Sequence, residues 1–226
     1  MLGGFFMQGG YYSIAIDGPA SSGKSTIAKK VSKELGFEYV DTGAMYRALT
    51  WKVLEYNIDP KNKEKVIDLL NDSEIDFIDG DIYLDGNIVN DEIRLNHVSQ
   101  NVSYIAIIPE VREKMVESQR AMANKKNIIM DGRDIGTVVL VESNFKFFLT
   151  ASVEERARRR YSELSKGDNT GVNLKDIESE IKKRDKIDTN REINPLKMAD
   201  DAILIDTTEK TIQEVVNIII SYVKGR

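Results

Sequence analysis

The sequence predicts an α/β fold whose parallel sheet carries helices on both faces. Short apolar segments, long enough for buried strands, alternate with longer segments whose apolar residues have helical spacing. A glycine-rich loop joins the first apolar segment to the first helical one. This alternation is typical of parallel sheets, because each crossover between parallel strands needs a long connection, usually a helix. We therefore expect a three-layer fold with a five-stranded parallel sheet, an inserted small α+β domain and a short helical lid.

The first quarter of the chain is predicted to form two strand–helix units. The first apolar run ends at Gly18, as expected of a buried strand. In the segment that follows, Ile27 and Val31 lie on one helical face, and Gly36 ends the helix. The expected elements are a strand at 13–17, a helix at 24–35, a strand at 37–41 and a helix at 44–56.

The middle of the chain breaks this rhythm. Three short apolar runs are separated by Asp-Gly pairs at 79–80 and 85–86, and such pairs are strong signals for β-hairpins. We therefore expect a small α+β insertion at 59–105. Its expected elements are a polar helix at 61–70 and strands at 75–78, 82–84 and 88–89. A helix is then expected at 110–124, with Pro109 near its start.

The alternation of strands and helices then resumes to the end of the chain. The expected elements are strands at 127–131, 145–150 and 202–206, helices at 153–164, 174–187 and 211–223, and a loop at 165–171. The expected organisation is a core made of 13–58, 106–151 and 172–226, the insertion at 59–105, a lid at 152–171 and a flexible extension at 1–12.

The residue inventory excludes whole classes of chemistry. The 226 residues include no Cys and a single His, so disulfides, thiolate nucleophiles and metal sites with Cys or two His ligands are excluded. We expect that histidine, His97, to be a surface or packing residue. The remaining Lys, Arg, Asp, Glu and hydroxyl groups suit phosphoryl transfer, in which positioning and charge stabilisation supply most of the catalysis. The net charge of −5 disfavours a nucleic-acid partner, which usually needs a basic face.

No segment indicates a membrane or secretion. No stretch reaches the roughly 18 apolar residues that a membrane span needs, and residues 1–12 lack the features of a secretion signal. We therefore expect a cytoplasmic protein with no membrane partner. Because no additional hydrophobic stripe indicates an interface between subunits, we also expect a monomer.

Residues 18–25 (GPASSGKS) meet every position of the phosphate-binding pattern G-x-x-x-x-G-K-[ST]. The pattern follows a predicted strand and opens a predicted helix, so the loop N–H groups and the helix N-terminus face phosphate oxygens. In this setting Lys24 can reach the β- and γ-phosphates, and the Ser25 hydroxyl can ligate Mg²⁺. The chain has no guanine-reading N-K-x-D motif, which argues against a GTPase.

Arginines gather in four further segments. Arg47 and Arg133 follow predicted strands of the main sheet, where open α/β sheets bind ligands, and a guanidinium can hold a phosphate with two hydrogen bonds. Arg184, Asp188 and Arg191 lie at i, i+4 and i+7, on one helical face. The fourth segment is an arginine-rich run at residues 156–160.

These arginines also have plainer explanations. Arg47 and Arg112 could be ordinary surface residues. The run at 156–160 could be a solvated face paired with neighbouring glutamates, and Arg184 could pair with Asp188 only to stabilise a helix. The nearby phosphate loop favours a site, because transfer between two anions needs many positive groups around one centre.

Five segments carry longer motifs: IDGPASSGKST at 16–26, DTGAMYRA at 41–48, DGRDIGTVV at 131–139, RDKIDTNR at 184–191 and INPLKMADDAILIDTT at 193–208. Together they resemble the bacterial cytidylate kinase family, and the resemblance covers nearly all of 13–223. The insertion at 59–105 resembles the monophosphate-binding domain of that family. One departure is Leu-Val-Glu at 140–142, where many members have an aromatic residue and a proline. We expect it to alter a connecting loop and not the chemistry.

The resemblance implies that ATP phosphorylates CMP or dCMP with Mg²⁺, giving ADP and CDP or dCDP. The ATP phosphates would be held by Gly18, Pro19, Ala20, Ser21, Ser22, Gly23, Lys24, Ser25 and Thr26. CMP would be held by Thr42, Arg47, Ser103, Arg112, Arg133, Asp134, Arg184, Asp188 and Arg191. The lid that closes over ATP would carry Arg156, Arg158, Arg159 and Arg160. Charge stabilisation during transfer would come from Lys24, Arg133, Arg156, Arg160 and Arg191.

Within the CMP set, the resemblance assigns the phosphate to Arg47, Arg133 and Arg191, the sugar to Arg184 and Asp188, and the base to Ser103, Arg112 and Asp134. The base assignment has a physical rationale. Cytosine offers an N4 amino donor where uracil offers an acceptor, and a carboxylate accepts only from the former. Asp134 is the candidate acceptor.

Two other functions stay open on sequence grounds. A kinase of another small acceptor, such as UMP, AMP or a sugar, would share the phosphate loop and the arginines. A regulatory or nucleic-acid-binding ATPase would instead need an arginine from a partner subunit or a basic face, and the acidic composition disfavours it.

Overall fold

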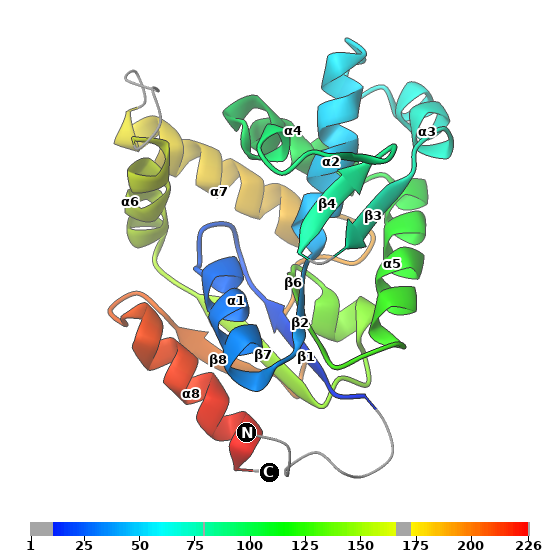
Figure 1. Ribbon diagram of the computed structural model, residues 1–226. Coiled ribbons are helices and arrows are strands. Elements are labelled where there is room, and N and C mark those ends of the chain that lie inside the picture. Colours follow the sequence, from blue (N-terminus) through cyan, green and yellow to red (C-terminus); the bar gives the residue numbers. More distant parts are fainter. Residues whose placement is uncertain (1–10, 79, 166–172, 226) are drawn as a thin grey trace.

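The computed structural model describes residues 11–78, 80–165 and 173–225 (Figure 1). Most of the expected extension at 1–12 and of the expected loop at 165–171 lies outside the described residues. Within the described ranges, no helix is both long and apolar enough to cross a membrane.

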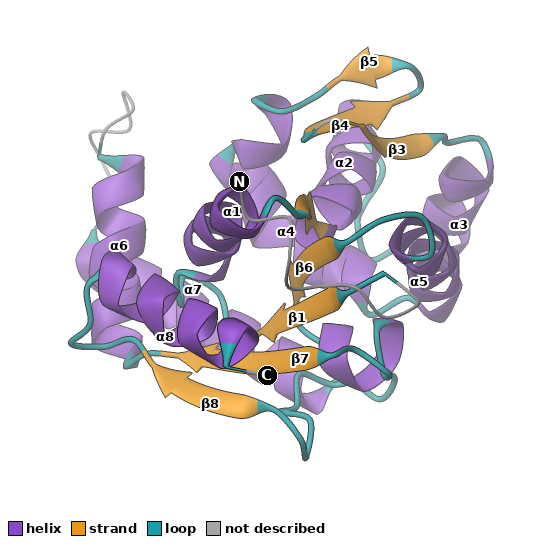
Figure 2. Ribbon diagram, turned by 60° about the horizontal axis from the view of Figure 1, so that its bottom comes forward, coloured by secondary structure: helices purple, strands orange, loops and turns teal. Residues whose placement is uncertain are grey.

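The main sheet has five parallel strands and confirms the predicted fold class (Figure 2). Their order is β2 (Glu38–Asp41), β6 (Ile128–Gly132), β1 (Ser13–Asp17), β7 (Phe145–Thr150) and β8 (Ile203–Asp206). At the C-terminal end of β1, Asp17 lies opposite Gly132 in β6 and Phe148 in β7. The chain builds β2 and β6 on one side of β1 before it builds β7 and β8 on the other. This topology opens a crevice at the C-terminal end of β1.

Side chains of β1, β2 and β6 alternate between two hydrophobic clusters, as the two-residue period of a strand requires. On β1, Ile14 and Ile16 pack into the cluster shared with α1 (Lys24–Leu35) and α8 (Ile212–Lys224). Ala15 packs into the opposite cluster, shared with α2 (Thr42–Glu55) and α5 (Pro109–Ala123). The helices therefore cover both faces of the sheet (Figure 1).

The phosphate loop between β1 and α1 needs glycine at its first position. Gly18 has a φ of +149°, and a Cβ there would lie 1.9 Å from the carbonyl oxygen of Leu149 in β7. At the other end of the loop, Gly23 precedes α1 with a φ of 91° and offers no capping side chain. The first N–H groups of α1 consequently face the loop without a side-chain partner, which is the arrangement that binds anions.

The insertion consists of α3 (Lys63–Asn71), a three-stranded antiparallel sheet and α4 (Asn96–Ala106). The strands are β3 (Ile75–Ile78), β4 (Asp81–Leu84) and β5 (Asn87–Ile88). Asp85 and Gly86 both have positive φ, at 51° and 77°, which is the tight turn that an Asp-Gly pair predicts. A 3₁₀ turn, Glu92–Arg94, and α4 are elements that the sequence analysis does not predict.

The expected lid at 152–171 contains one described helix, α6 (Val153–Leu164), and the next helix, α7 (Leu174–Asn190), lies in the expected core. They pack through a small cluster of Ala157, Ile177 and Ile181. α6 has the predicted bounds, whereas α7 continues to Asn190, past the predicted end at 187. After β6 the chain also makes an unpredicted π-helical turn, Ile135–Val139.

Candidate active site

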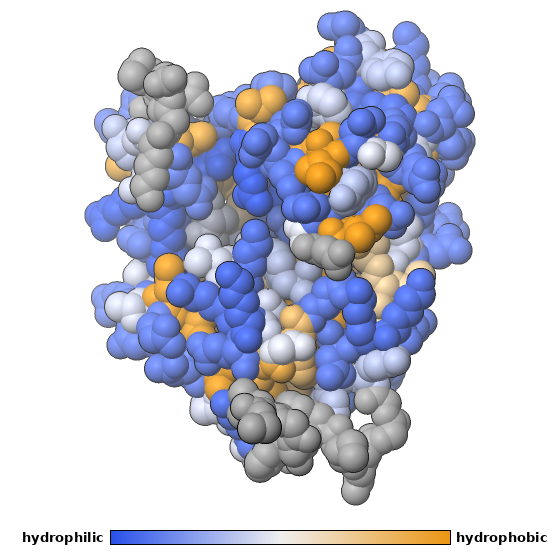
Figure 3. Space-filling view, viewed as in Figure 1, coloured by the Kyte–Doolittle hydropathy of each residue, from blue (hydrophilic) through white to orange (hydrophobic). Residues whose placement is uncertain are grey.

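A cavity of about 540 Å³ lies at the C-terminal ends of β1, β2 and β6 and reaches the insertion and the lid. Figure 3 shows a mostly hydrophilic face, which includes this region between the main sheet, the insertion and the lid. Sixteen of the sequence-predicted site residues line the cavity. They are Ala20, Ser21, Gly23, Lys24, Ser25, Thr26, Thr42, Arg47, Ser103, Arg112, Arg133, Asp134, Arg160, Arg184, Asp188 and Arg191. Gly18, Pro19, Ser22, Arg156, Arg158 and Arg159 lie outside its lining.

Lys24 lies at the base of the phosphate loop. Its side chain is buried, and its Nζ donates to the carbonyl oxygen of Pro19 at 2.8 Å. Burial and the charge of the nearby Arg133 lower the pKa of Lys24 to about 7, although Asp131 and Asp17 oppose the shift. A phosphate placed here would favour the charged ammonium form.

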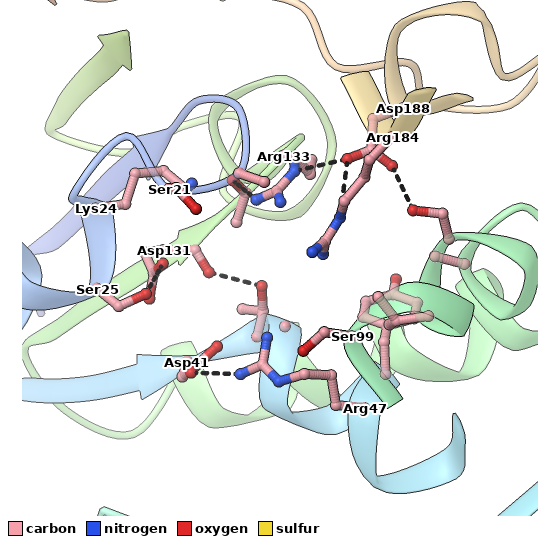
Figure 4. A pocket seen from close by; sticks show the side chains of 18 of the residues that line it. Ser21, Lys24, Ser25, Asp41, Arg47, Ser99, Asp131, Arg133, Arg184 and Asp188 are labelled. Atoms are coloured by element: carbon pink, nitrogen blue, oxygen red, sulfur yellow. Dashed lines mark hydrogen bonds and ion pairs between the residues drawn. The ribbon is translucent and has the colours of Figure 1, made fainter. Parts of the chain in front are cut away.

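Asp131, at the end of β6, joins the phosphate loop to β2. Its Oδ2 accepts from Ser25 Oγ at 2.8 Å, and its Oδ1 accepts from Tyr39 Oη at 2.7 Å. Its backbone carbonyl accepts from Thr42 Oγ1 at 2.7 Å. Burial raises the pKa of Asp131, and the negative charge of Asp41 adds to the effect. Ser25 Oγ and Asp131 Oδ2 lie together at the edge of the cavity (Figure 4). Hydroxyl and carboxylate oxygens are metal ligands of the kind that suits Mg²⁺.

Arg47 and Asp41 form an ion pair at the start of α2. The distance from Arg47 Nη2 to Asp41 Oδ2 is 2.8 Å, and the two side chains are 18% and 11% exposed. Burial raises the pKa of Asp41, but the charge of Arg47, the Ala44 N–H and the charge of Arg94 together hold it below its ordinary value. Asp41 also accepts from the Ala44 N–H at 2.9 Å. The same carboxylate therefore caps α2 and orients the Arg47 side chain.

Asp188 on α7 gathers polar groups from three segments (Figure 4). Arg133 Nε donates to its Oδ2 at 2.9 Å, Arg184 Nε lies 4.0 Å from the same oxygen, and Ser103 Oγ lies 3.4 Å from its Oδ1. Burial opposes ionisation of Asp188, but Arg133 and Arg184 keep its pKa below the ordinary value. Burial and the charge of Arg133 lower the pKa of Arg184 to about 10. The positive charges of Arg133 and Arg184 therefore repel each other.

Asp134 lies between two arginines from distant segments. Arg112 on α5 pairs with its Oδ2, and Arg191 Nη2, just after α7, lies 3.2 Å from its Oδ1. The guanidinium of Arg112 also lies 5.8 Å from the centre of the Tyr46 ring. Burial and the charge of Arg112 lower the pKa of Arg191. This arrangement gives a buried carboxylate with fixed orientation at the wall of the cavity.

The arginine-rich run at 156–160 divides among different environments. Arg156 is buried, pairs with Asp185 at 2.7 Å and donates to the carbonyl oxygen of Ala20 at 3.3 Å. Arg159 donates to the carbonyl oxygens of Ser22 and Thr207, at 3.4 and 2.6 Å. Both arginines therefore contact backbone carbonyl oxygens of the phosphate loop and do not line the cavity.

Arg160 and Arg158 complete the run. Arg160 lines the cavity and donates to Asn96 on α4 at 3.3 Å. The Arg158 side chain is 72% exposed and lies 3.8 Å from Glu155. The solvated-face explanation therefore describes Arg158, whereas Arg159 pairs with Glu155 at 3.0 Å and also contacts the phosphate loop.

Sequence reasoning missed several residues that build the site. Tyr39, Asp41 and Asp17 hold other site groups by hydrogen bonds, and no sequence motif assigns them a partner. Arg94 and Ser99 line the cavity from the 3₁₀ turn and from α4, the elements that were not predicted. The helical spacing of Val98, Val102 and Ile105 was a usable signal for α4. His97 is exposed on α4, as expected of a surface histidine.

Comparison with known proteins agrees with this geometry. The family model described as "Cytidylate kinase" matches residues 14–225. A cytidylate kinase from Caldanaerobacter subterraneus subsp. tengcongensis is 56% identical over 204 residues, which are 90% of each chain. One from Alkaliphilus oremlandii is 52% identical over 215 residues, 95% of this chain and 99% of the relative. Among solved structures, a gluconokinase from Sinorhizobium meliloti has a TM-score of 0.50 at 12% identity, covering 95% of this chain and 94% of its own. This last likeness concerns the fold alone.

Proposed function

The chain belongs to the cytidylate kinase family, and we propose that the cavity described above binds ATP at the phosphate loop and CMP among the arginines. The enzyme transfers the γ-phosphoryl group of ATP to CMP or dCMP, giving ADP and CDP or dCDP. One observation supports placing ATP and CMP side by side in this cavity. Lys24 and the arginines that face it, among them Arg47 and Arg133, line the same space, although they come from segments far apart in the sequence.

The donor side of the proposal consists of the phosphate loop and α1. The loop N–H groups and Lys24 would hold the β- and γ-phosphates, because the N-terminus of α1 and a buried ammonium both favour anions. Ser25, with Asp131 beside it, would hold Mg²⁺ together with phosphate oxygens. When bound, Mg²⁺ neutralises charge on the phosphates being transferred.

The acceptor side of the proposal is the arginine-lined wall. Arg47, Arg133 and Arg191 would bind the CMP phosphate, each with a guanidinium suited to two hydrogen bonds. The attacking group is a phosphate oxygen that is already anionic, so no strong general base is needed. The task of these residues is to bring two polyanions together, and their charges offset the repulsion.

The base and sugar would be recognised by the two buried carboxylates. Asp134 would accept from the cytosine N4 amino group, and Arg112 would hold Asp134 in place and reach the acceptor edge of the base. Asp188 would accept from a ribose hydroxyl, with Arg184 and Ser103 beside it. A uracil base would place its O4 acceptor against the Asp134 carboxylate, where two acceptors repel each other, and this is the physical basis for selectivity.

The lid arginines take different roles in this proposal. Arg160 lines the cavity and would contact the transferred phosphoryl group when the lid closes over bound nucleotide. Arg156 and Arg159 position the phosphate loop through Ala20 and Ser22. Arg158 faces solvent, so this proposal gives it no role in ATP binding.

We further propose that the protein acts as a monomer in the cytoplasm. The described residues of this chain place Lys24, Arg47, Arg133 and Arg191 around one cavity, and the proposed chemistry uses no arginine from a partner. ATP and CMP are small charged metabolites, and the chain's negative charge does not favour a nucleic-acid partner.

The test is a coupled assay of ADP release with Mg-ATP and each of CMP, dCMP, UMP, AMP and GMP as acceptor. The proposal expects fast turnover with CMP and dCMP and little with the others. Efficient use of a different acceptor would keep the phosphate-loop assignment and overturn the base-reading residues. ATP hydrolysis that needs no acceptor, or that needs a polynucleotide, would overturn the proposed kinase site.

A further inference from the structure

Asp17, the last residue of β1, is a buried carboxylate to which the proposed mechanism assigns no role. It is 4% exposed and does not line the active-site cavity. Its Oδ1 accepts from the Ile135 N–H at 2.8 Å, and its Oδ2 accepts from the Gly136 N–H at 2.7 Å. A carboxylate on one strand thus satisfies two consecutive backbone donors that lie 118 and 119 residues further along the chain.

Those two donors open the π-helical turn Ile135–Val139, which follows Asp134 directly. The first N–H groups of any helical turn lack partners within the turn and need an external acceptor. The Asp134 side chain does not cap the turn, since it is engaged with Arg112 and Arg191. Asp17 therefore takes the place of a capping residue, and the backbone that it fixes is the one that carries Asp134.

We propose that Asp17 is a positioning residue for base recognition, because its carboxylate fixes the turn that aims Asp134 at the cytosine edge. This inference rests on the proposed role of Asp134. It adds a link between the two halves of the site, since Asp17 also immediately precedes Gly18, the first residue of the phosphate loop.

The two-pronged contact requires a carboxylate. Aspartate supplies two acceptor oxygens, whereas asparagine would turn an NH₂ donor toward one of the N–H groups. The fit around the contact is also close. A Cβ added at Gly136 would lie 3.4 Å from Asp17 Oδ2 and 3.2 Å from Lys146 Cδ. Lys146 cannot replace Asp17 as a partner for the turn, because an ammonium group has no acceptor for the two N–H groups; its Nζ pairs with Asp201 at 2.8 Å.

The far end of the same turn provides a matched control. Arg120, on α5, donates to the carbonyl oxygens of Val138 and Val139, at 2.6 and 3.3 Å. It holds the end of the turn that lies away from Asp134. Arg120→Ala therefore loosens the same turn without touching the N–H groups next to Asp134.

The experiment compares Asp17→Asn and Arg120→Ala with the unaltered enzyme in steady-state kinetics with CMP and UMP, alongside thermal unfolding. For Asp17→Asn we expect the KM for CMP to rise by about tenfold and the preference for CMP over UMP to fall by a similar factor, with the KM for ATP within about twofold. For Arg120→Ala we expect a lower melting temperature with unchanged KM and preference.

Asp17→Ser gives a second route to the answer if Asp17→Asn does not fold. Its hydroxyl oxygen cannot replace the two carboxylate oxygens that accept from Ile135 and Gly136, so its preference for CMP over UMP should also fall. An unchanged preference in the folded variants, or equal loss for ATP and CMP, would overturn the inference.

Asp134→Ala separates this inference from the proposed function. If that variant keeps normal CMP selectivity, the role proposed for Asp134 is wrong and the inference falls with it. If Asp134→Ala loses selectivity while Asp17→Asn and Asp17→Ser keep it, the proposed function stands and only the role of Asp17 is overturned.

Discussion

The Arg112 guanidinium and the Asp134 carboxylate form an ion pair in which both side chains are buried, 2% and 8% exposed. Burying two charges costs desolvation energy, and a well-packed apolar pair would often be at least as stable. The pair therefore points to a functional requirement at this wall of the cavity. An ionised acceptor held in one orientation can select the amino group of cytosine.

Asp134→Ala should impair the use of CMP far more than the use of ATP. Loss of a hydrogen bond to a charged group is worth about 1.5–3 kcal/mol, so kcat/KM for CMP should fall by roughly 10- to 100-fold or more. The KM for ATP should stay within about twofold. Steady-state kinetics with each substrate varied in turn measures both. Asp201→Asn, which removes an exposed carboxylate paired with Lys146, is the control and should match the unaltered enzyme. Equal losses for both substrates would make Asp134 a structural residue.

Arg133→Lys tests whether the acceptor wall needs a forked guanidinium. Arg133 Nε donates to Asp188 at 2.9 Å and its Nη1 donates to the Gly132 carbonyl oxygen at 3.3 Å, which leaves its Nη2 for a phosphate. Lysine keeps the charge but cannot hold both partners, so kcat should fall by at least about tenfold. The control is Arg120→Lys, an arginine outside the cavity. Near-normal kcat in Arg133→Lys would show that a point charge at this position is sufficient.

Much of the fold follows from local sequence. The strands β1 and β7 and the helices α1 and α6 have the predicted bounds, because glycine, polar turns or a capping serine end each apolar run. The helix α4 is different. It is preceded by Leu95, which offers no capping side chain, and it lies among polar residues of the insertion. The turn Ile135–Val139 depends on Asp17, so no local pattern could have predicted it.

The site also contains residues that a local motif predicts and residues that only tertiary packing brings together. The phosphate loop is a contiguous motif, so its residues and their setting could be predicted from sequence. The pairing of Arg112 with Asp134 depends on how α5 packs beside β6, which no motif records. The arginine run at 156–160 shows this limit within a single helix. Its residues point in different directions around α6, and only tertiary packing decides which of them are buried.

Lys24→Met should abolish most turnover while the protein stays folded. Burial lowers the pKa of Lys24 to about 7, so the charged lysine is costly to bury in the absence of phosphate. Methionine has a similar length and no charge, so the melting temperature should be unchanged or higher. We expect kcat to fall by about 100-fold or more, since the transferred phosphoryl group loses a cation. A folded variant with near-normal kcat would contradict the role assigned to Lys24.

Arg156→Ala and Arg158→Ala form a matched pair on α6. Arg156 is buried and bridges Asp185 and the phosphate loop, so its removal leaves a carboxylate without its partner. We expect Arg156→Ala to lower the free energy of unfolding by about 3–5 kcal/mol. The exposed Arg158 should contribute less than about 0.5 kcal/mol. Urea denaturation of both variants measures the difference. Similar losses from the two would show that Arg156 does not act through its buried pair.

Asp17 should leave a signature in the pH dependence of stability. Burial raises its pKa from 3.8 to about 6, although the Ile135 and Gly136 N–H groups and the charge of Lys24 oppose the rise and that of Asp134 adds to it. The folded chain therefore binds this proton more tightly than the unfolded chain does. Consequently, its contribution to the free energy of unfolding is fully present below pH 3.8 and is lost as the pH rises through 6.

The difference in free energy of unfolding between the unaltered protein and Asp17→Asn isolates this contribution. Carboxylates with lowered pKa, such as Asp41 and Asp188, act in the opposite direction, but they act equally in both proteins and cancel. Between about pH 4.5 and about pH 7.5, the unaltered protein should lose about 2 kcal/mol relative to the variant. Urea denaturation across that range measures it. A difference that is independent of pH would mean that the Asp17 carboxyl titrates alike in the folded and unfolded chains, contrary to its burial against the turn.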